Sequence, residues 1–202
     1  IDLVFFINGL PVATVELKTD FTQSVEAAMA QYRADRPPRN GKTGRAEPLL
    51  AFRRGAVVHF AMSDSDIRMT TRLAGGSTFF LPFNRGNAGG KGNAPDPTGH
   101  RTRYLWEEVW SRDAWLDLLG RFVHVIPVET GATKAAKLKA GSTIFPRYHQ
   151  WDAVRKLTEA AWKEGPGQRY LIQHSAGSGK TNTIAWIAHR LARLHDAEDK
   201  KV

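Results

Sequence analysis

The sequence predicts an α/β fold in which a mixed sheet with flanking helices is followed by the start of a second α/β unit. Two observations lead to this prediction. The chain opens with two apolar segments, "LVFFI" and "VATVELK", on either side of the strong turn signal Asn8-Gly9. Near its other end, the apolar stretch "RYLIQ" leads into the glycine-rich "HSAGSGKT", which a further apolar-periodic segment follows. Strands that alternate with helices across glycine-rich turns are typical of α/β proteins.

Composition limits the classes of function that the chain can have. Its 202 residues suit one large domain or parts of two. Lys and Arg number 29 against 20 acidic residues, a formal net charge of +9, which indicates either a polyanionic partner or a solvated basic surface. Cysteine is absent, which excludes disulfide scaffolds and Cys-ligated metal sites. No apolar run is long enough to span a membrane and no secretory signal is visible, so we expect a cytoplasmic protein with no membrane partner.

The first half continues with alternating element signals after the hairpin of residues 1–18. Residues 22–38 predict a helix that Thr22 or Ser24 caps and that Pro37-Pro38 ends. The segments "AVVHFAMS" and "DIRMTTRL" predict two strands around a Ser-Asp-Ser turn. Residues 84–100 are rich in Gly, Asn and Pro and predict a mobile surface loop, and residues 111–123 predict a helix.

A basic segment without an apolar period, residues 129–142, predicts a linker. It would divide the chain into a domain of residues 1–128 and a second unit of residues 143–202. The second unit predicts a helix near residues 148–163, a turn, a short strand "RYLIQ", the glycine-rich loop and a final helix.

The glycine-rich loop has the residue types that phosphate binding needs. Gly177 and Gly179 would let the backbone N–H groups turn inward toward an anion, and the following helix adds the positive end of its dipole. Lys180 would reach the β- and γ-phosphates, and the Thr181 hydroxyl would ligate Mg²⁺. His174 stands where the full pattern has its first glycine. A chance Gly-rich turn is the alternative, which the strand before the loop and the helix after it disfavour.

The segment "HSAGSGKT" resembles motif I of superfamily 2 helicases and translocases, and "FPRYHQWDAVRKL" resembles the segment that those proteins place before it. The resemblance implies the start of a RecA-like P-loop domain with ATP and Mg²⁺ as cofactors. Gln150 would read adenine, although a surface Gln at a helix start is the competing interpretation. The implied nucleotide-binding residues are Gln150, Ala176, Gly177, Ser178, Gly179, Lys180 and Thr181, with Thr181 also a metal ligand.

Two carboxylates and a lysine in the opening hairpin form a second constellation. Asp2, Glu16 and Lys18 resemble the PD-(D/E)xK endonuclease core, with Ile1 where the motif's name has Pro. Two carboxylate oxygens suit Mg²⁺, which activates a water for phosphodiester cleavage, and an ammonium group can orient that water. An ordinary polar strand face is the alternative.

The geometry of the hairpin tests this constellation. Glu16 and Lys18 share a strand face because they are two residues apart. A two-residue turn would pair Asp2 with Val15 and put Asp2 on the other face. We therefore predict a three-residue turn, residues 7–9, which pairs Asp2 with Thr14, diagonal to Glu16.

Together, "NGLPVATVELK", "AAMAQYRADRPP", "FPRYHQ" and "HSAGSGKT" resemble the restriction (R) subunit of type I restriction–modification enzymes, the HsdR family, across nearly the whole chain. The resemblance implies a type I site-specific deoxyribonuclease that couples ATP-driven translocation of double-stranded DNA to Mg²⁺-dependent cleavage, with methyltransferase (M) and specificity (S) subunits as partners. The implied catalytic residues are Asp2, Glu16, Lys18 and Gln31, with Asp2 and Glu16 as metal ligands. Gln31 would be the glutamine of the helix after the core, although its spacing to Tyr32 departs from the QxxxY pattern.

Three expectations complete the sequence-based interpretation. The chain has no initiator Met and no DEAD-like acidic segment after the loop, so we expect a slice of a longer protein that does not hydrolyse ATP efficiently by itself. One rival is a basic DNA-binding module with a degenerate, non-cleaving nuclease core. A second rival is a DNA helicase without cleavage activity.

Overall fold

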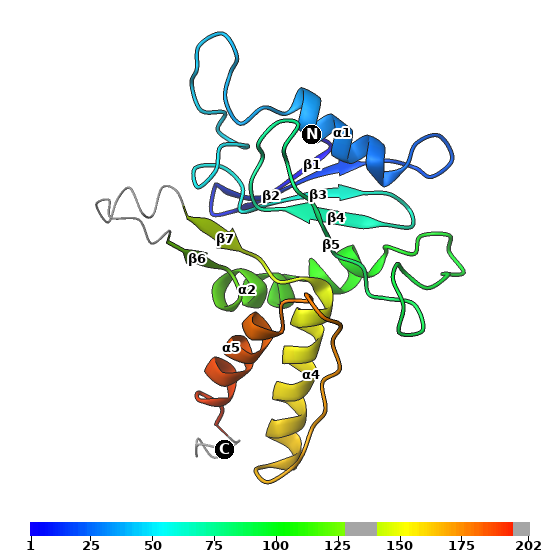
Figure 1. Ribbon diagram of the computed structural model, residues 1–202, viewed down its shortest axis with the longest axis vertical. Coiled ribbons are helices and arrows are strands. Elements are labelled where there is room, and N and C mark those ends of the chain that lie inside the picture. Colours follow the sequence, from blue (N-terminus) through cyan, green and yellow to red (C-terminus); the bar gives the residue numbers. More distant parts are fainter. Residues whose placement is uncertain (128–140, 196–202) are drawn as a thin grey trace.

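The computed structural model describes residues 1–127 and 141–195. Figure 1 shows a sheet below helix α1 (Val25–Asp35), with the remaining helices on the other side of the sheet. The predicted mixed α/β architecture with flanking helices is thus confirmed. The proposed linker of residues 129–142 lies outside the described residues except for Gly141 and Ser142, so the domain boundaries remain a prediction.

The main sheet has five strands in the order β1-β2-β3-β4-β5. The β2 and β3 strands are parallel and α1 connects them, whereas the other neighbours are antiparallel. The strands are β1 (Leu3–Ile7), β2 (Leu10–Leu17), β3 (Val58–Met62), β4 (Ile67–Thr70) and β5 (Leu81–Pro82). A parallel pair needs a crossover, and the amphipathic helix predicted after the hairpin supplies it.

The later helices and a second pair of strands lie on the other side of the sheet (Figure 1). A π-helix, η1 (Leu105–Val109), precedes α2 (Arg112–Arg121), and β6 (His124–Ile126) pairs with β7 (Ser142–Ile144) in a separate ribbon. Helices α4 (Tyr148–Glu164) and α5 (Lys180–Leu191) then lie side by side below the sheet. All of the predicted helices are present.

The opening hairpin forms, but the predicted three-residue turn is wrong. Ile7 pairs with Leu10 around a two-residue turn in which Asn8 and Gly9 have φ values of 49° and 80°. Such a turn matches the natural twist of two paired strands, which explains its preference here. The register instead shifts within the strands, at a bulge that leaves Val12 as the extra residue.

Two apolar clusters fill the two faces of the sheet. The smaller one lies under α1 and contains Ala28, Tyr32, Leu50 and Phe80. The larger one starts on the opposite face and continues without interruption into the last two helices; its largest buried members include Phe60, Phe83, Phe122, Phe145, Trp115, Trp151 and Trp186. The tryptophans in this cluster are therefore packing residues.

Two local predictions need correction or refinement. The "RYLIQ" segment is not a strand: no described strand pairs with it, and Leu171 is 92% exposed. A strand needs a partner for its N–H and C=O groups, and apolar composition alone does not provide one. The loop of residues 84–100 is irregular, as predicted, but Asn93 is buried and bonds the Arg85 amide (2.8 Å) and the Ser65 carbonyl (3.0 Å). Its centre is thus fixed to the body of the protein.

Within the two described ranges, no helix combines the length and the apolar character that a bilayer crossing requires.

Candidate functional site

The face of β2 that lies under α1 carries the first candidate site. Alternation along the strand puts Thr14, Glu16 and Lys18 on this face, and the Lys18 amide continues the pairing with β3 by donating to the Met62 carbonyl (2.9 Å). The Glu16 side chain is fully buried, whereas Lys18 is half-buried. Two of the predicted site residues therefore lie together, with Glu16 deeper than Lys18.

The carboxylate of Glu16 has one occupied and one unoccupied oxygen. Arg36 Nε donates to Glu16 Oε1 at 2.7 Å, and the two side chains form a salt bridge. In the described part of the chain, buried Oε2 has no hydrogen-bond partner. A buried carboxylate oxygen without a partner is energetically costly, so this oxygen is a ready acceptor for a cation or a donor group.

The bulge at Val12 brings the second carboxylate to the same place. Leu3 pairs with Val15, so the next position places Asp2 across from Glu16, closer than the predicted pairing with Thr14 would have done. Asp2 Oδ2 accepts a hydrogen bond from the Leu17 amide at 2.6 Å, which fixes this side chain at the end of the strand pair. In residues 1–127 and 141–195, no group of three or more His, Cys, Asp or Glu side chains lies close enough together to hold a metal ion.

A buried hydrogen-bond chain that the sequence did not reveal supports this face. The Thr14 hydroxyl lies 2.8 Å from the Tyr32 hydroxyl and 2.7 Å from His59 Nδ1. Burial lowers the pKa of His59 to about 4, so this imidazole is neutral near pH 7. Burial raises the pKa of Tyr32, and the negative charges of Glu16 and Asp2 act in the same direction.

In the sequence, the hydrogen-bonded side chains of Thr14, Tyr32 and His59 could be found only from their positions along the predicted strands and helix. Thr14 stands two residues before Glu16 on the same strand, and His59 is its neighbour in β3. Predicted site residue Gln31 is half-buried on α1, next to Tyr32. The helix therefore turns Tyr32, rather than its neighbour, toward Thr14.

The second candidate site is the glycine-rich loop before α5. Gly177 and Gly179 adopt φ values of 70° and 83°, and Gly179 caps the helix that begins at Lys180. The buried Ser178 hydroxyl has no hydrogen-bond partner among the residues described. The Lys180 ammonium donates to the backbone carbonyls of the loop, at 3.3 Å for His174 and 3.0 Å for Ser175. Ala176 and Thr181 are exposed at the loop surface.

Gln150 connects α4 to this loop. Its Oε1 accepts from the Arg147 amide (2.9 Å), and its Nε2 donates to the Gly179 carbonyl (2.9 Å). The amide retains one further N–H and one further lone pair for a ligand. The approach is so close that a Cβ on Gly179 would lie 2.5 Å from Gln150 Nε2. The structure therefore brings Gln150 together with the predicted loop residues.

Two histidines flank the loop at close range. Their rings, those of His149 and His174, lie 4.7 Å apart, and His149 Nε2 is 3.2 Å from the Ser178 carbonyl. Burial lowers the pKa of both side chains, so both are neutral near pH 7. Beside them lies a cavity of about 410 Å³ that Gln150, Gly179 and Arg147 share with Thr70 and Phe79 of the sheet region.

Comparison with protein families identifies both parts of the chain. Residues 1–78 match the family model described as type I restriction enzyme R protein N terminus. Residues 143–202 match the model described as type III restriction enzyme, res subunit. No curated protein and no solved structure matches the chain.

The first match contains the two facing carboxylates and the second contains the glycine-rich loop, in the same order along the chain as the two sites. The chain therefore belongs with the restriction (R) subunits of type I restriction enzymes, the HsdR family, and carries their N-terminal region followed by a helicase-like region.

Proposed function

We propose that this chain provides the DNA-cleaving centre and the start of the ATP-driven motor of a type I site-specific deoxyribonuclease. The observation that carries the proposal is the buried Glu16 carboxylate, which has one unpartnered oxygen and lies across from Asp2. This arrangement lies inside the region that matches the R protein N terminus. In this proposal the sheet and α1 are a PD-(D/E)xK nuclease core.

The residues at this centre fit a magnesium ion. Glu16 Oε2 is a buried acceptor with no partner in the described structure, and a hard carboxylate oxygen is a ligand that Mg²⁺ prefers. Asp2 and Glu16 would hold the ion, which supplies charge neutralisation at the phosphodiester and a more acidic bound water. Lys18, on the same strand face, would orient the water. Gln31, on α1, would be a further catalytic residue.

The glycine-rich loop fits the phosphates of ATP. Its left-handed Gly177 and Gly179 and the α5 N-terminus present backbone N–H groups, and the Ser178 hydroxyl lacks a partner in the part of the chain that the structure describes. Lys180 would leave the loop carbonyls for the β- and γ-phosphates, and Thr181 would contact Mg²⁺. The remaining donor and acceptor of Gln150 would read adenine.

The proposed partners follow from the family. Double-stranded DNA would be the substrate, and methyltransferase and specificity subunits would complete the complex in the cytoplasm. Residues 1–128 would form the nuclease domain, residues 129–142 a linker, and residues 143–202 the start of a RecA-like translocase domain.

One experiment separates the two proposed activities in the assembled restriction complex. Glu16→Gln removes charge with little change in volume and should reduce DNA cleavage by more than about tenfold, as loss of even a ligand's supporting partner does. ATP hydrolysis should persist in this variant. Lys180→Ala should abolish ATP hydrolysis and translocation. Lys18→Ala should behave like Glu16→Gln.

Glu26→Gln is the matched control, because Glu26 is exposed on α1 and its removal changes the net charge equally. One observation favours the rival of a non-cleaving DNA-binding module: Arg36 already neutralises one oxygen of Glu16. If Glu16→Gln cleaves DNA as fast as Glu26→Gln does, Glu16 is not part of the nuclease centre, and its burial is explained by the ion pair with Arg36.

A further inference from the structure

A third concave site lies outside both candidate centres. A cavity of about 740 Å³ opens beside the segment that connects α1 to β3, and Pro38, Ala51 and Leu73 contribute to its apolar wall. Four arginines line it, Arg39, Arg53, Arg54 and Arg72, and none of the carboxylates in residues 1–127 and 141–195 does. None of these four forms a salt bridge with the residues that the structure describes. We call this set the arginine cleft.

The centre of the arginine cleft is a built arrangement rather than a set of free surface side chains. The guanidinium carbons of Arg53 and Arg72 lie 5.1 Å and 4.9 Å from the Phe52 ring centroid. Arg53 Nη2 also lies close to Gly141, where a Cβ would approach it to 2.9 Å. The Nε and Nη2 atoms of Arg53 are buried and have no hydrogen-bond partner among the described residues. Packing therefore holds a guanidinium, two of whose nitrogen atoms the described residues leave unsatisfied.

The backbone at this point is also unusual. Arg53 has φ of 62°, a region that side chains other than Gly, Asn and Asp seldom adopt. Residues in this conformation concentrate at ligand-binding positions, where the surrounding structure imposes it. Like charges held close together repel, so an anion in the cleft would relieve the repulsion among the four arginines.

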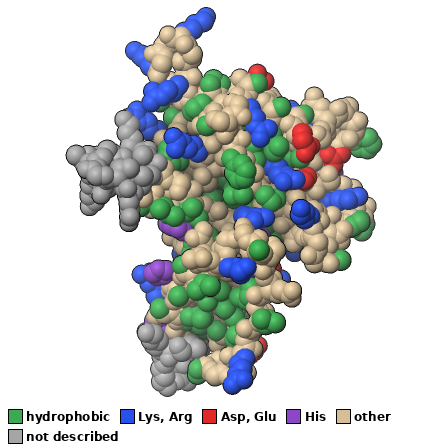
Figure 2. Space-filling view, in the orientation of Figure 1, with side chains coloured by type: hydrophobic (Ala, Val, Ile, Leu, Met, Phe, Trp, Pro, Cys, Tyr) green, Lys and Arg blue, Asp and Glu red, His purple; other side chains and the backbone are tan. Residues whose placement is uncertain are grey.

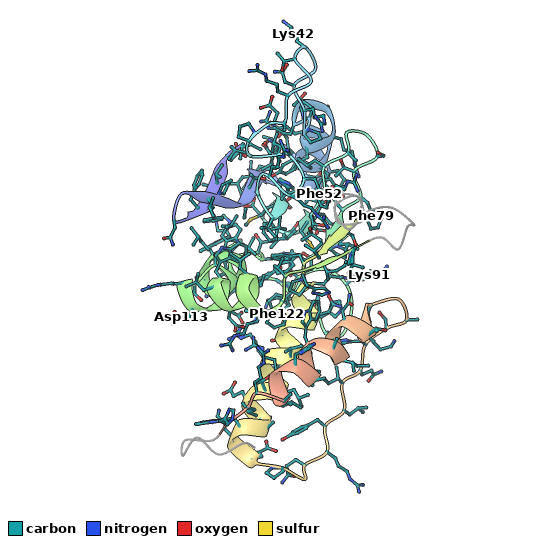
Figure 3. The ribbon with its side chains drawn as sticks, turned by 90° about the vertical axis from the view of Figure 1, so that its left-hand side faces the viewer. Lys42, Phe52, Phe79, Lys91, Asp113 and Phe122 are labelled. Carbon is teal, nitrogen blue, oxygen red and sulfur yellow. The ribbon has the colours of Figure 1, made fainter. Side chains whose placement is uncertain are left out.

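The arginine cleft is the inner end of a longer basic segment. Residues 36–54 contain six cations, Arg36, Arg39, Lys42, Arg45, Arg53 and Arg54, against one acid, Glu47. Figure 3 shows Lys42 at the outer tip of this segment and Phe52 nearer the sheet. In Figure 2, Lys and Arg side chains gather over this part of the molecule, whereas the visible carboxylates gather on the opposite side. A cationic strip of this kind suits a partner with repeated negative charges rather than a single phosphate.

We propose that the arginine cleft and the basic segment 36–54 bind the phosphodiester backbone of double-stranded DNA. The planar guanidinium fork matches two phosphate oxygens, and four such groups in one cleft can grip neighbouring phosphates. The segment starts at Arg36, which bonds the Glu16 carboxylate, so DNA bound along it reaches the nuclease centre. The last step rests on the proposed function, whereas the binding does not.

The test compares two triple variants of the full chain that lose the same charge. Arg39→Ala/Arg54→Ala/Arg72→Ala removes exposed cations of the cleft, and Arg101→Ala/Arg112→Ala/Arg169→Ala removes three exposed cations outside it. Affinity for a random-sequence DNA duplex is measured by fluorescence anisotropy across a salt series with EDTA present, so that cleavage plays no part. The cleft variant should bind at least tenfold more weakly, and its log–log salt slope should fall by about 2 to 3, since each phosphate contact contributes about 0.9.

The control variant should keep both the affinity and the slope close to those of the unmodified chain. Equal slopes for the two triple variants would overturn the proposal, as would displacement of the DNA by inorganic pyrophosphate at matched ionic strength, which would assign the cleft to a free phosphate compound. Cleavage by the Glu16→Gln variant is measured separately, in the presence of Mg²⁺. If that variant still cleaves DNA, the proposed nuclease centre fails while the salt slopes continue to decide the cleft.

Discussion

The most informative single residue is Glu16, because its burial is hard to explain by structure alone. Its side chain is fully buried, and Arg36 balances one oxygen while the other has no partner in the described chain. An apolar residue would fill the same volume without the cost of desolvating a charge. The ligand of the proposed function would offset this cost at the second oxygen, and the buried Thr14, Tyr32 and His59 side chains fix the surface on which the carboxylate lies.

His59 gives this network a measurable pH dependence. Its folded-state pKa of about 4 lies below its ordinary value of 6.5, so the unfolded chain binds the proton more readily. The contribution of neutral His59 to stability is complete above pH 6.5 and is lost as the pH falls toward 4. The free energy of unfolding should decrease by about 1.4 kcal/mol per pH unit in this window, or about 3 kcal/mol in all.

Urea unfolding of the unmodified chain and of His59→Gln at pH values from 7.5 to about 4 checks this prediction. The variant lacks the titrating group, so the difference in unfolding free energy between the two proteins should shrink as the pH falls. His149 and His174 titrate in the same direction in both proteins and cancel in that difference. A difference that stays constant with pH would contradict the assignment.

Comparison of elements shows what sequence patterns can and cannot specify. The hairpin, the crossover helix and the final helices follow from turn residues and apolar periods that are local in the sequence. The bulge at Val12 has no such local signal: "PVATV" is regular, and the extra residue is decided by how β2 must pair with β1 and β3 at once. The register that places Asp2 across from Glu16 thus results from the bulge at Val12 and not from the predicted three-residue turn.

For the glycine-rich loop, the sequence identified the residues but not the structure around them. The motif identified the residues of the loop, and the structure places them at the start of α5. The strand predicted before the loop is absent because apolar residues form a strand only beside another one, and no described strand is available to pair with residues 169–173. The contact between Gln150 and Gly179 was likewise invisible, since it depends on the packing of α4 against α5.

That contact leads to a prediction for the element pair. Gly179→Ala places a Cβ 2.5 Å from Gln150 Nε2, so the buried amide must move and lose its bond to the loop. Gly177→Ala meets no atom within 4 Å, although both glycines have positive φ and incur similar backbone strain. We expect Gly179→Ala to lower the free energy of unfolding by about 1 to 3 kcal/mol more than Gly177→Ala does.

A double-mutant cycle with Gln150→Ala supplies the control. Removal of the Gln150 side chain makes room for the new Cβ, so Gly179→Ala should cost much less in this background than in the unmodified chain. Additive costs in chemical denaturation would show that the two residues do not interact, and the contact would then have no role in holding the loop.

At the scale of the molecule, the apolar core crosses the boundary between the two family matches. Phe145 follows β7 in the second matched region, and its ring centroid is 6.0 Å from that of Phe60 in the first matched region and 6.2 Å from that of Phe83, which lies between the two matches in the sequence. Tyr148 and Trp151 extend the same cluster into α4, and Trp186 of α5 packs on Phe122 at 5.5 Å. The sheet and the last two helices therefore share one buried interior.

A shared interior predicts that the two regions unfold together. Phe145→Ala should lower the free energy of unfolding by about 3 to 5 kcal/mol, because it leaves a cavity where both regions meet. Phe145→Leu retains most of the volume and should cost less than about 1.5 kcal/mol, which keeps the measurement possible if the Ala variant is too unstable. Phe79→Ala is the control, since Phe79 is 74% exposed and its loss should change stability by less than about 0.5 kcal/mol.

In urea, helix content followed by circular dichroism and tryptophan fluorescence should report one midpoint for every variant. Two separate midpoints, with Phe145→Leu shifting only one of them, would mean that the two matched regions fold independently and that the aromatic cluster does not couple them.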